Sequence, residues 1–280
     1  MNPVKHICPR HLSWSMVRIE FLGSGNAFLP QGRYHSLLML DESLLIDAPP
    51  TLLASLRRRE LSPADIRTVM ITHWHGDHVF GFPFLLLERK YISDRQAESR
   101  LSVHSPVGGE DKLRHLCELA YPGSLDDRLS ENVDWDESEN GEVLGMSEWS
   151  FERFRVLHDE NVDPHGYLLH HESGLRLMHT GDSGPCEAIT SRARDCDVVV
   201  IELGVPDHVH IPHHFRPQTL SALANSCPDT TFLATHTYAD DPQSGREPSL
   251  TDVLPVLPPN VVQVRDEDAF DWSAAGLVEL

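Results

Sequence analysis

The sequence predicts an α/β protein, and three features of the chain support this fold class. First, short apolar runs typical of strands, such as residues 68–72 and 197–203, alternate with segments that have helical spacing. Second, several of these runs are followed at once by a histidine or an aspartate, as a site at one end of a sheet requires. Third, the 280 residues suffice for a large core, and no repeat or linker divides them. We expect a single domain at 16–280 after an N-terminal extension, 1–15, that lacks periodicity and could be disordered.

The first half of the chain reads as five strands and three helices. The expected strands are 16–22, 35–40 and 44–47 as a hairpin, 68–72, and 101–104. The expected helices are 51–60, 80–87 and 111–121. Leucines on one side of 51–60 and of 111–121 predict that these helices pack against a core, and the arginines that end the first favour its C-terminal dipole.

The second half begins with an acidic segment, 122–147, that has little regular pattern. A solvated loop is the preferred interpretation, and a lid beside the site is the alternative. Alternation returns at Trp149, and further strands are expected to end at Leu157 and to span 166–170, 175–179, 197–203, 230–235, 261–264 and 269–272. One helix is expected at 217–225.

Composition restricts the classes of function. Hydrophobic residues make up 40% and charged residues 24%, as in globular proteins, and no apolar run approaches the roughly 18 residues that span a membrane. The start lacks a secretory signal, so we expect a cytoplasmic protein without a membrane partner. Five scattered cysteines predict neither disulfides nor a thiolate zinc site. The net charge of −20 disfavours a long nucleic acid as partner, because binding one depends on Lys and Arg.

The densest chemical signal is His73-Trp74-His75-Gly76-Asp77-His78, directly after the strand expected at 68–72. Imidazoles and a carboxylate packed this tightly require a partner, and a divalent metal neutralises and orients them best. In an extended loop alternate residues point the same way, so His73 and His75 can reach one metal. Asp77 and His78 then turn toward a second.

Further ligands must come from later strand ends, because four residues in one loop cannot enclose two metals. His158, Asp182 and His236 each follow an expected strand. The predicted centre therefore has two ligand sets that share one carboxylate: His73, His75 and His158 for the first metal, Asp77, His78 and His236 for the second, and Asp182 between them. Nitrogen and oxygen ligands without thiolates suit two zinc ions, with manganese or iron as alternatives. A hydroxide bridging the metals would be the nucleophile, since coordination lowers the pKa of water to about 7.

The chain resembles metallo-β-lactamase-fold hydrolases, and within them the branch of ribonuclease Z and related phosphodiesterases. The matching motifs run in order from about residue 17 to 240: Phe21–Gly25, Leu45–Asp47, Ile71–Gly81, His158 with Gly166-Tyr167, Thr180–Asp182, and Thr235-His236. The resemblance implies an αββα four-layer sandwich, in which helices flank two mixed β-sheets and the dinuclear site lies at the edge between them. It also suggests a homodimer.

A histidine that precedes a helix assists leaving-group protonation or binds phosphate in this branch, and the resemblance assigns that role to His214. The neighbouring His213 is an alternative candidate for this role, and His208 and His210 are further candidates. His165 competes with His158 as a metal ligand, although its position before Gly166-Tyr167 favours His158. Asp77 can also orient the nucleophile while it binds metal.

These features predict a metal-dependent hydrolase, and most specifically a phosphodiesterase for a small substrate such as a cyclic nucleotide. Ribonuclease Z enzymes commonly insert a basic tRNA-gripping arm after the third motif. Here 23 residues separate His158 from Asp182, with one Arg and no Lys. Hydrolysis of a carboxylic ester or lactone, a thioester or an aryl sulfate is the first alternative, and tRNA 3′ processing the second. A redox di-iron protein is disfavoured by His75, where a carboxylate is usual, and a non-catalytic scaffold by the complete ligand set.

Overall fold

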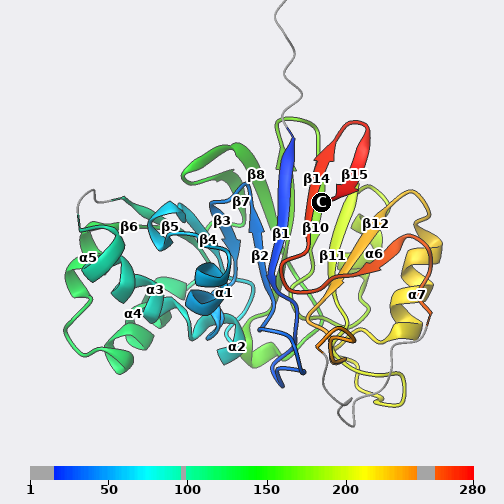
Figure 1. The fold of residues 1–280 in the computed structure, drawn as a ribbon, viewed down its shortest axis with the longest axis horizontal. Helices are drawn as coiled ribbons and strands as arrows, with labels where there is room; N and C mark the ends of the chain where they lie inside the picture. The colour runs from blue at the N-terminus through cyan, green and yellow to red at the C-terminus, as the bar shows by residue number, and fades with distance from the viewer. Residues whose placement is uncertain (1–15, 96–98, 245–255) are drawn as a thin grey trace, which may run out of the picture.

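Two mixed β-sheets lie face to face, with helices on the outer face of each (Figure 1). The computed structural model describes residues 16–95, 99–244 and 256–280, so the expected extension at 1–15 lies outside the described residues. The first sheet has the order β15-β14-β1-β2-β3-β4-β5-β6. Its strands are β1 (Val17–Gly23), β2 (Leu37–Leu40), β3 (Leu44–Ile46), β4 (Thr68–Met70), β5 (Leu101–His104), β6 (Val133–Asp136), β14 (Ala269–Ser273) and β15 (Gly276–Glu279).

The second sheet has the order β13-β12-β11-β10-β9-β8-β7. Its strands are β7 (Asn140–Val143), β8 (Met146–Arg155), β9 (His165–His171), β10 (Arg176–His179), β11 (Val198–Glu202), β12 (Thr231–Thr235) and β13 (Val261–Gln263). Strands β3 to β6 of the first sheet and β10 to β13 of the second are parallel. Each parallel set therefore brings several strand ends to one edge, where ligands bind in open α/β sheets.

Three apolar cores hold the layers together. The central core joins the inner faces of both sheets and includes Phe21, Trp149 and Tyr167. The second packs the first sheet against α1 (Leu52–Arg58), α3 (Phe82–Glu88), α4 (Gly109–Ala120) and α5 (Asp126–Glu131). The third packs the second sheet against α6 (Glu187–Ala193) and α7 (Pro217–Ser226). This is the predicted αββα sandwich.

The structure corrects the expectation of an irregular loop at 122–147. This segment contains α5, β6, β7 and the start of β8. Strand β6 pairs in parallel with β5, and β7 pairs with β8 at the edge of the second sheet. An edge strand is stabilised largely by backbone hydrogen bonds and keeps polar side chains, so its sequence lacks an apolar pattern. The short helix α2 (Gly76–Val79), helix α6 and strand β15 were also not expected.

In the part of the chain that the structure describes, every helix is too short or too polar to cross a membrane.

His104 ends β5 as a fully buried side chain. Its Nε2 accepts a hydrogen bond from the backbone N–H of Leu144 at 3.0 Å, and its Nδ1 lies 3.0 Å from Asp136 Oδ2. Burial lowers the pKa of His104 to about 4, despite the opposing effect of Asp136. Between pH 6.5 and 4 the unfolded chain therefore binds a proton that the folded chain does not, and stability falls as the pH falls.

We expect His104→Gln to flatten this acid dependence, because glutamine can accept the Leu144 hydrogen bond but does not titrate. The unfolding free energies of variant and wild type should converge by up to about 3 kcal/mol as the pH falls from 6.5 to 4. Urea unfolding at a series of pH values measures this. His115→Gln, at an exposed site on α4, should follow the wild type. Parallel curves for His104→Gln and wild type would contradict the assignment.

Candidate metal centre

The predicted motif runs from the end of β4 into α2, so that a strand and a helix each position part of it. His73 Nε2 and His158 Nε2 both lie 3.1 Å from His75 Nδ1. One ligand atom from each of these histidines and one from Asp182 lie within 4.8 Å of one another. His158 comes from the segment after β8, so the structure brings both sheets to this point.

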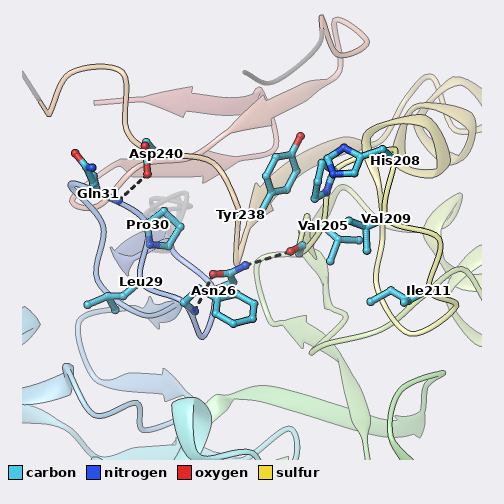
Figure 2. Close-up of a pocket in the computed structure, with 13 residues that line it drawn as sticks. Asn26, Leu29, Pro30, Gln31, Val205, His208, Val209, Ile211, Tyr238 and Asp240 are labelled. Atoms are coloured by element: carbon cyan, nitrogen blue, oxygen red, sulfur yellow. Dashed lines mark hydrogen bonds between the residues drawn. The ribbon is translucent and has the colours of Figure 1, made fainter. Parts of the chain in front are cut away.

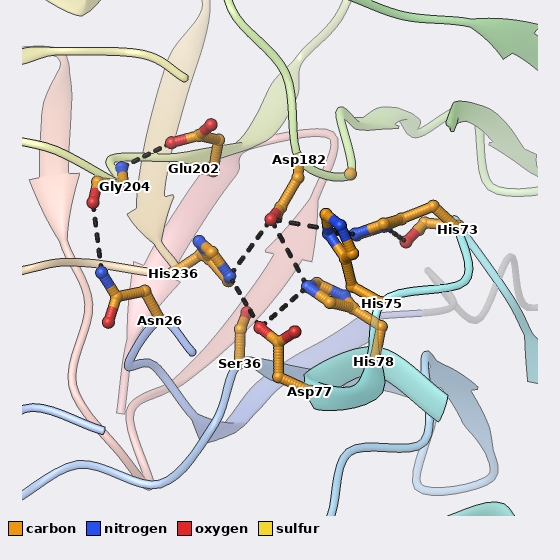
Figure 3. A network of polar contacts seen from close by, with 12 residues as sticks. Asn26, Ser36, His73, His75, Asp77, His78, Asp182, Glu202, Gly204 and His236 are labelled. Carbon is orange, nitrogen blue, oxygen red and sulfur yellow. Dashed lines mark hydrogen bonds and ion pairs between the residues drawn. The ribbon is translucent and has the colours of Figure 1, made fainter. Parts of the chain in front are cut away.

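Asp77, His78 and His236 form a second group whose ligand atoms also lie within 4.8 Å of one another. Asp77 Oδ2 is 3.3 Å from His78 Nε2 and 3.4 Å from His236 Nε2. Asp182 lies between the two groups: its Oδ2 is 3.3 Å from His236 Nε2 and 3.5 Å from His78 Nε2 on one side, and 3.9 Å from His73 Nε2 on the other (Figure 3). This is the arrangement that a shared carboxylate ligand requires.

Hydrogen bonds on the outer side of the rings fix their orientation. His78 Nδ1 lies 2.7 Å from Asp47 Oδ2, His73 Nδ1 lies 3.0 Å from Thr72 Oγ1, and His158 Nδ1 lies 3.1 Å from the carbonyl oxygen of His213. An Nδ1–H that donates to these acceptors leaves the Nε2 lone pair directed inward. His78 Nε2 is buried and faces the carboxylates of Asp77 and Asp182 at 3.3 and 3.5 Å. A nitrogen that faces inward, toward other candidate ligand atoms, fits a metal ligand.

The electrostatics of the cluster also fit a cation. Burial alone would raise the pKa values of Asp77 and Asp182, but neighbouring histidines outweigh it and hold both well below their usual range. Burial, with the adjacent His78, lowers the pKa of His73 and keeps that ring neutral. Burial would also lower the pKa of His78, but Asp182 and Asp47 raise it well above its usual value. Ionised carboxylates beside imidazoles form a suitable donor set for a divalent metal, which would replace the proton that the raised pKa of His78 favours.

His214 joins the cluster from the loop before α7. One of its ring nitrogens lies within 4.8 Å of ligand atoms of Asp182 and His236. Its Nδ1 lies 2.7 Å from Oε1 of Glu202, a buried residue at the end of β11. Burial would lower the pKa of His214, but the hydrogen bond and charge of Glu202 outweigh it and raise the pKa to about 9. The ring is therefore a cation at neutral pH, held by a buried carboxylate.

A close backbone contact sets the path of the loop that carries His213 and His214. A Cβ atom at Gly184 would lie 1.6 Å from the carbonyl oxygen of Pro212, so only glycine permits this approach. His213 then contributes its carbonyl to His158, while the ring of His214 faces the cluster. The structure thus separates two histidines that the sequence left as alternatives.

The remaining candidate histidines lie elsewhere. His165 is buried at the start of β9, with its Nδ1 2.9 Å from the carbonyl of Asp163, and is outside the three groups of ligand atoms. His210 Nδ1 accepts a hydrogen bond from Arg216 at 2.9 Å. His208 lines a separate cavity.

The structure brings all seven predicted ligands and His214 together, whereas sequence reasoning missed Glu202 and assigned no site role to Asp47. Both residues are acidic and stand at the end of a buried strand, Glu202 in β11 and Asp47 directly after β3. The rule that selected Asp182 and His236, a polar residue after an apolar run, could have selected both.

Known proteins share this fold and sequence pattern. Ribonuclease Z of Pyrobaculum islandicum is 25% identical over 90% of this chain and 96% of its own length. A diphosphatase of the PhnP family superposes with a TM-score of 0.65 at 17% identity, over 95% of this chain and 99% of that one. Human tRNase Z, short form, superposes with a TM-score of 0.61 at 20% identity, over 85% and 100%. The predicted metallo-β-lactamase fold and the resemblance to ribonuclease Z-like hydrolases are confirmed.

One family model matches residues 17–248, which include every ligand of the candidate centre. Its description is "Anti-Pycsar protein Apyc1". Because the match covers most of the chain, this protein belongs to the anti-Pycsar protein Apyc1 family.

Proposed function

We propose that this hydrolase uses a dinuclear metal centre to cleave a small phosphodiester such as a cyclic nucleotide. The observation that carries the proposal is the pair of ligand groups that share Asp182, with the Glu202–His214 pair at their edge. The similarity to proteins named ribonuclease Z and diphosphatase supports chemistry at a phosphate bond.

The metals would be held by the two groups already described, and their nitrogen and oxygen donors favour zinc. Manganese and iron are the alternatives for the same donors. When bound, such a metal pair lowers the pKa of water and stabilises charge on phosphoryl oxygens.

The protein's own groups supply orientation and a proton. Asp77 directs Oδ2 toward His78 and His236, which leaves its second oxygen to orient an attacking water. His214 carries a proton that Glu202 stabilises, and we assign it to protonate the departing oxygen. Proton donation of this kind contributes roughly 10²- to 10⁴-fold to a rate.

A small substrate is favoured by the surroundings of the centre. The segment between His158 and Asp182 forms the β9–β10 hairpin within the second sheet rather than an arm. The net charge of −20 opposes a polyanion. Similarity to ribonuclease Z is the observation that keeps tRNA 3′ processing as a second candidate.

The proposed substrate class is tested with metal-loaded protein on a panel of compounds. We expect hydrolysis of bis-p-nitrophenyl phosphate and of cyclic nucleotides, and a loss of more than about 100-fold in Asp77→Ala or after chelation, because metal catalysis supplies several kcal/mol. Elemental analysis identifies the metal. Cleavage of lactones, thioesters or aryl sulfates without phosphodiesters would contradict the proposal, and efficient cleavage of a tRNA precursor alone would support the second candidate.

The role of Asp47 is tested by metal affinity. Asp47→Asn should lower the affinity about 10- to 100-fold, because an uncharged amide accepts the proton of His78 Nδ1 less strongly. Competition with a chromogenic chelator measures the dissociation constants. Asp111→Asn, at an exposed site on α4, should bind metal like the wild type. Equal affinities for the two variants would refute the orienting role.

Leaving-group dependence tests the Glu202–His214 pair. With an alkoxide leaving group, as in a cyclic nucleotide, His214→Gln and Glu202→Gln should each lower kcat about 10²-fold or more, since proton donation is lost or weakened. With p-nitrophenolate, which departs without a proton, the loss should be within about 5-fold. If the pair had a merely structural role, kcat would fall equally for both leaving groups. The metal content of the variants is measured as a control, and an unchanged content excludes a defect in the metal centre.

A further inference from the structure

A cavity of about 600 Å³ lies between three loops that follow strands β1, β11 and β12 (Figure 2). This volume is typical of small-molecule sites. The described residues that line it are Asn26, Phe28, Leu29, Pro30, Gln31, Gly204, Val205, Pro206, His208, Val209, Ile211, Tyr238 and Asp240. None of the predicted metal ligands is among them, so the role of this cavity is separate from metal binding.

The cavity and the candidate metal centre share a wall. Gly204 lines the cavity, its backbone N–H donates to Glu202, and a Cβ atom on it would lie 2.8 Å from His214 Nδ1. Asn26 also lines the cavity, and its backbone N–H donates to the carbonyl of Thr237, the residue after His236, at 3.1 Å. Figure 3 shows Asn26 and Gly204 of the cavity wall beside Glu202 and His236. A group attached to a phosphate at the metal centre would therefore lie beside this cavity.

The lining indicates what kind of group fits. Most of the described lining residues are apolar, and they include no lysine or arginine, so the cavity is unsuited to a second phosphate. Phe28 is 89% exposed, which leaves its ring open for contact with a ligand. Aromatic rings stack on such a face with modest specificity for the ring itself.

The turn that carries Phe28 is held in place. Asn26 Nδ2 donates to the carbonyl of Gly204 at 3.1 Å, and Asn26 Oδ1 accepts from the backbone N–H of Phe28 at 3.0 Å. Leu29 adopts a φ of 54°, a left-handed conformation unusual for a branched side chain. One buried amide thus links the loops on both sides of the cavity and fixes the position of Phe28 before a ligand binds.

We propose that this cavity receives an aromatic ring carried by an ester group of the scissile phosphate, and that Phe28 stacks on that ring and determines specificity for it. The inference rests on the proposed phosphodiesterase function and adds the chemical class of the substituent. A heteroaromatic base and a simple aryl group share the flat apolar face that this site would recognise.

The test compares the 3′,5′-cyclic phosphates of phenyl β-D-riboside and of methyl β-D-riboside, which share the scissile phosphate and the leaving oxygen and differ in the aromatic ring. The wild type should have the higher kcat/KM for the phenyl compound. Phe28→Ala should lower kcat/KM for the phenyl compound about 10-fold and leave the methyl compound unchanged, since only the ring loses a stacking partner. Phe28→Tyr should restore the preference. Tyr91→Ala removes a 49% exposed aromatic residue of the segment Arg89–Ser93, outside the cavity, and should behave like the wild type.

Equal kcat/KM values of the wild type for the two compounds, or equal losses for both in Phe28→Ala, would overturn the inference. A cyclohexyl riboside cyclic phosphate that matched the phenyl compound would overturn the preference for an aromatic ring. If neither these compounds nor bis-p-nitrophenyl phosphate were hydrolysed, the proposed function would fail separately, and calorimetry would still decide the inference. Phenyl phosphate should then bind metal-loaded wild type about 10-fold more tightly than methyl phosphate, and Phe28→Ala should remove the difference; equal binding would refute it.

Discussion

The buried carboxylate of Asp47 is the constraint on which the geometry of the candidate centre depends. It accepts hydrogen bonds from the backbone N–H and hydroxyl of Thr72 at 2.8 to 3.0 Å and lies 2.7 Å from His78 Nδ1. These contacts join β3, the end of β4 and α2. Asp47 has a φ of 72°, a conformation that persists only where the surroundings enforce it. Because an unpaired buried carboxylate is strongly destabilising, the motif cannot move away from Asp47 without a large cost in stability.

The second sheet contributes its ligands by a similar arrangement. Asp182 follows β10, Glu202 ends β11 and His236 follows β12, so the parallel strands deliver three polar groups to one edge. His236 also has a positive φ, 46°. The two edges are held in register by the buried Tyr167 of β9, whose hydroxyl donates at 2.8 Å to the carbonyl of Ile71, two residues before His73. Packing between the sheets thus determines how the two groups of ligands meet.

The sequence could predict the elements and ligands whose signal is local. The ligand spacing in His73–His78 is set by one loop, and His158, Asp182 and His236 each follow an apolar strand, so pattern alone located them. Glu202 also stands at the end of an apolar run, but this signal alone does not distinguish it from an ordinary strand boundary, which charged residues also mark. His213 and His214 are adjacent, and their roles differ because of the close approach of Gly184 to Pro212, which depends on tertiary structure. The edge strand β7 was missed because backbone pairing, rather than apolar side chains, defines it.

The net negative charge of the protein is compatible with the proposed anionic substrate. A bound phosphate interacts mainly with the charged groups beside it, and only weakly with distant charges. At physiological ionic strength, exposed charges are screened within about 8 Å, so a small phosphodiester in the centre responds mainly to groups nearby. There His214 carries a stabilised proton, and the ligands favour cations. A long RNA would also contact parts of the protein away from the centre. Because the chain has 43 acidic and 23 basic residues, many of those contacts would place a phosphate near a carboxylate. On the proposed function, we therefore expect charge to select by the length of the anion: the groups at the centre would attract one phosphodiester, while the acidic remainder of the protein would repel a polymer of them.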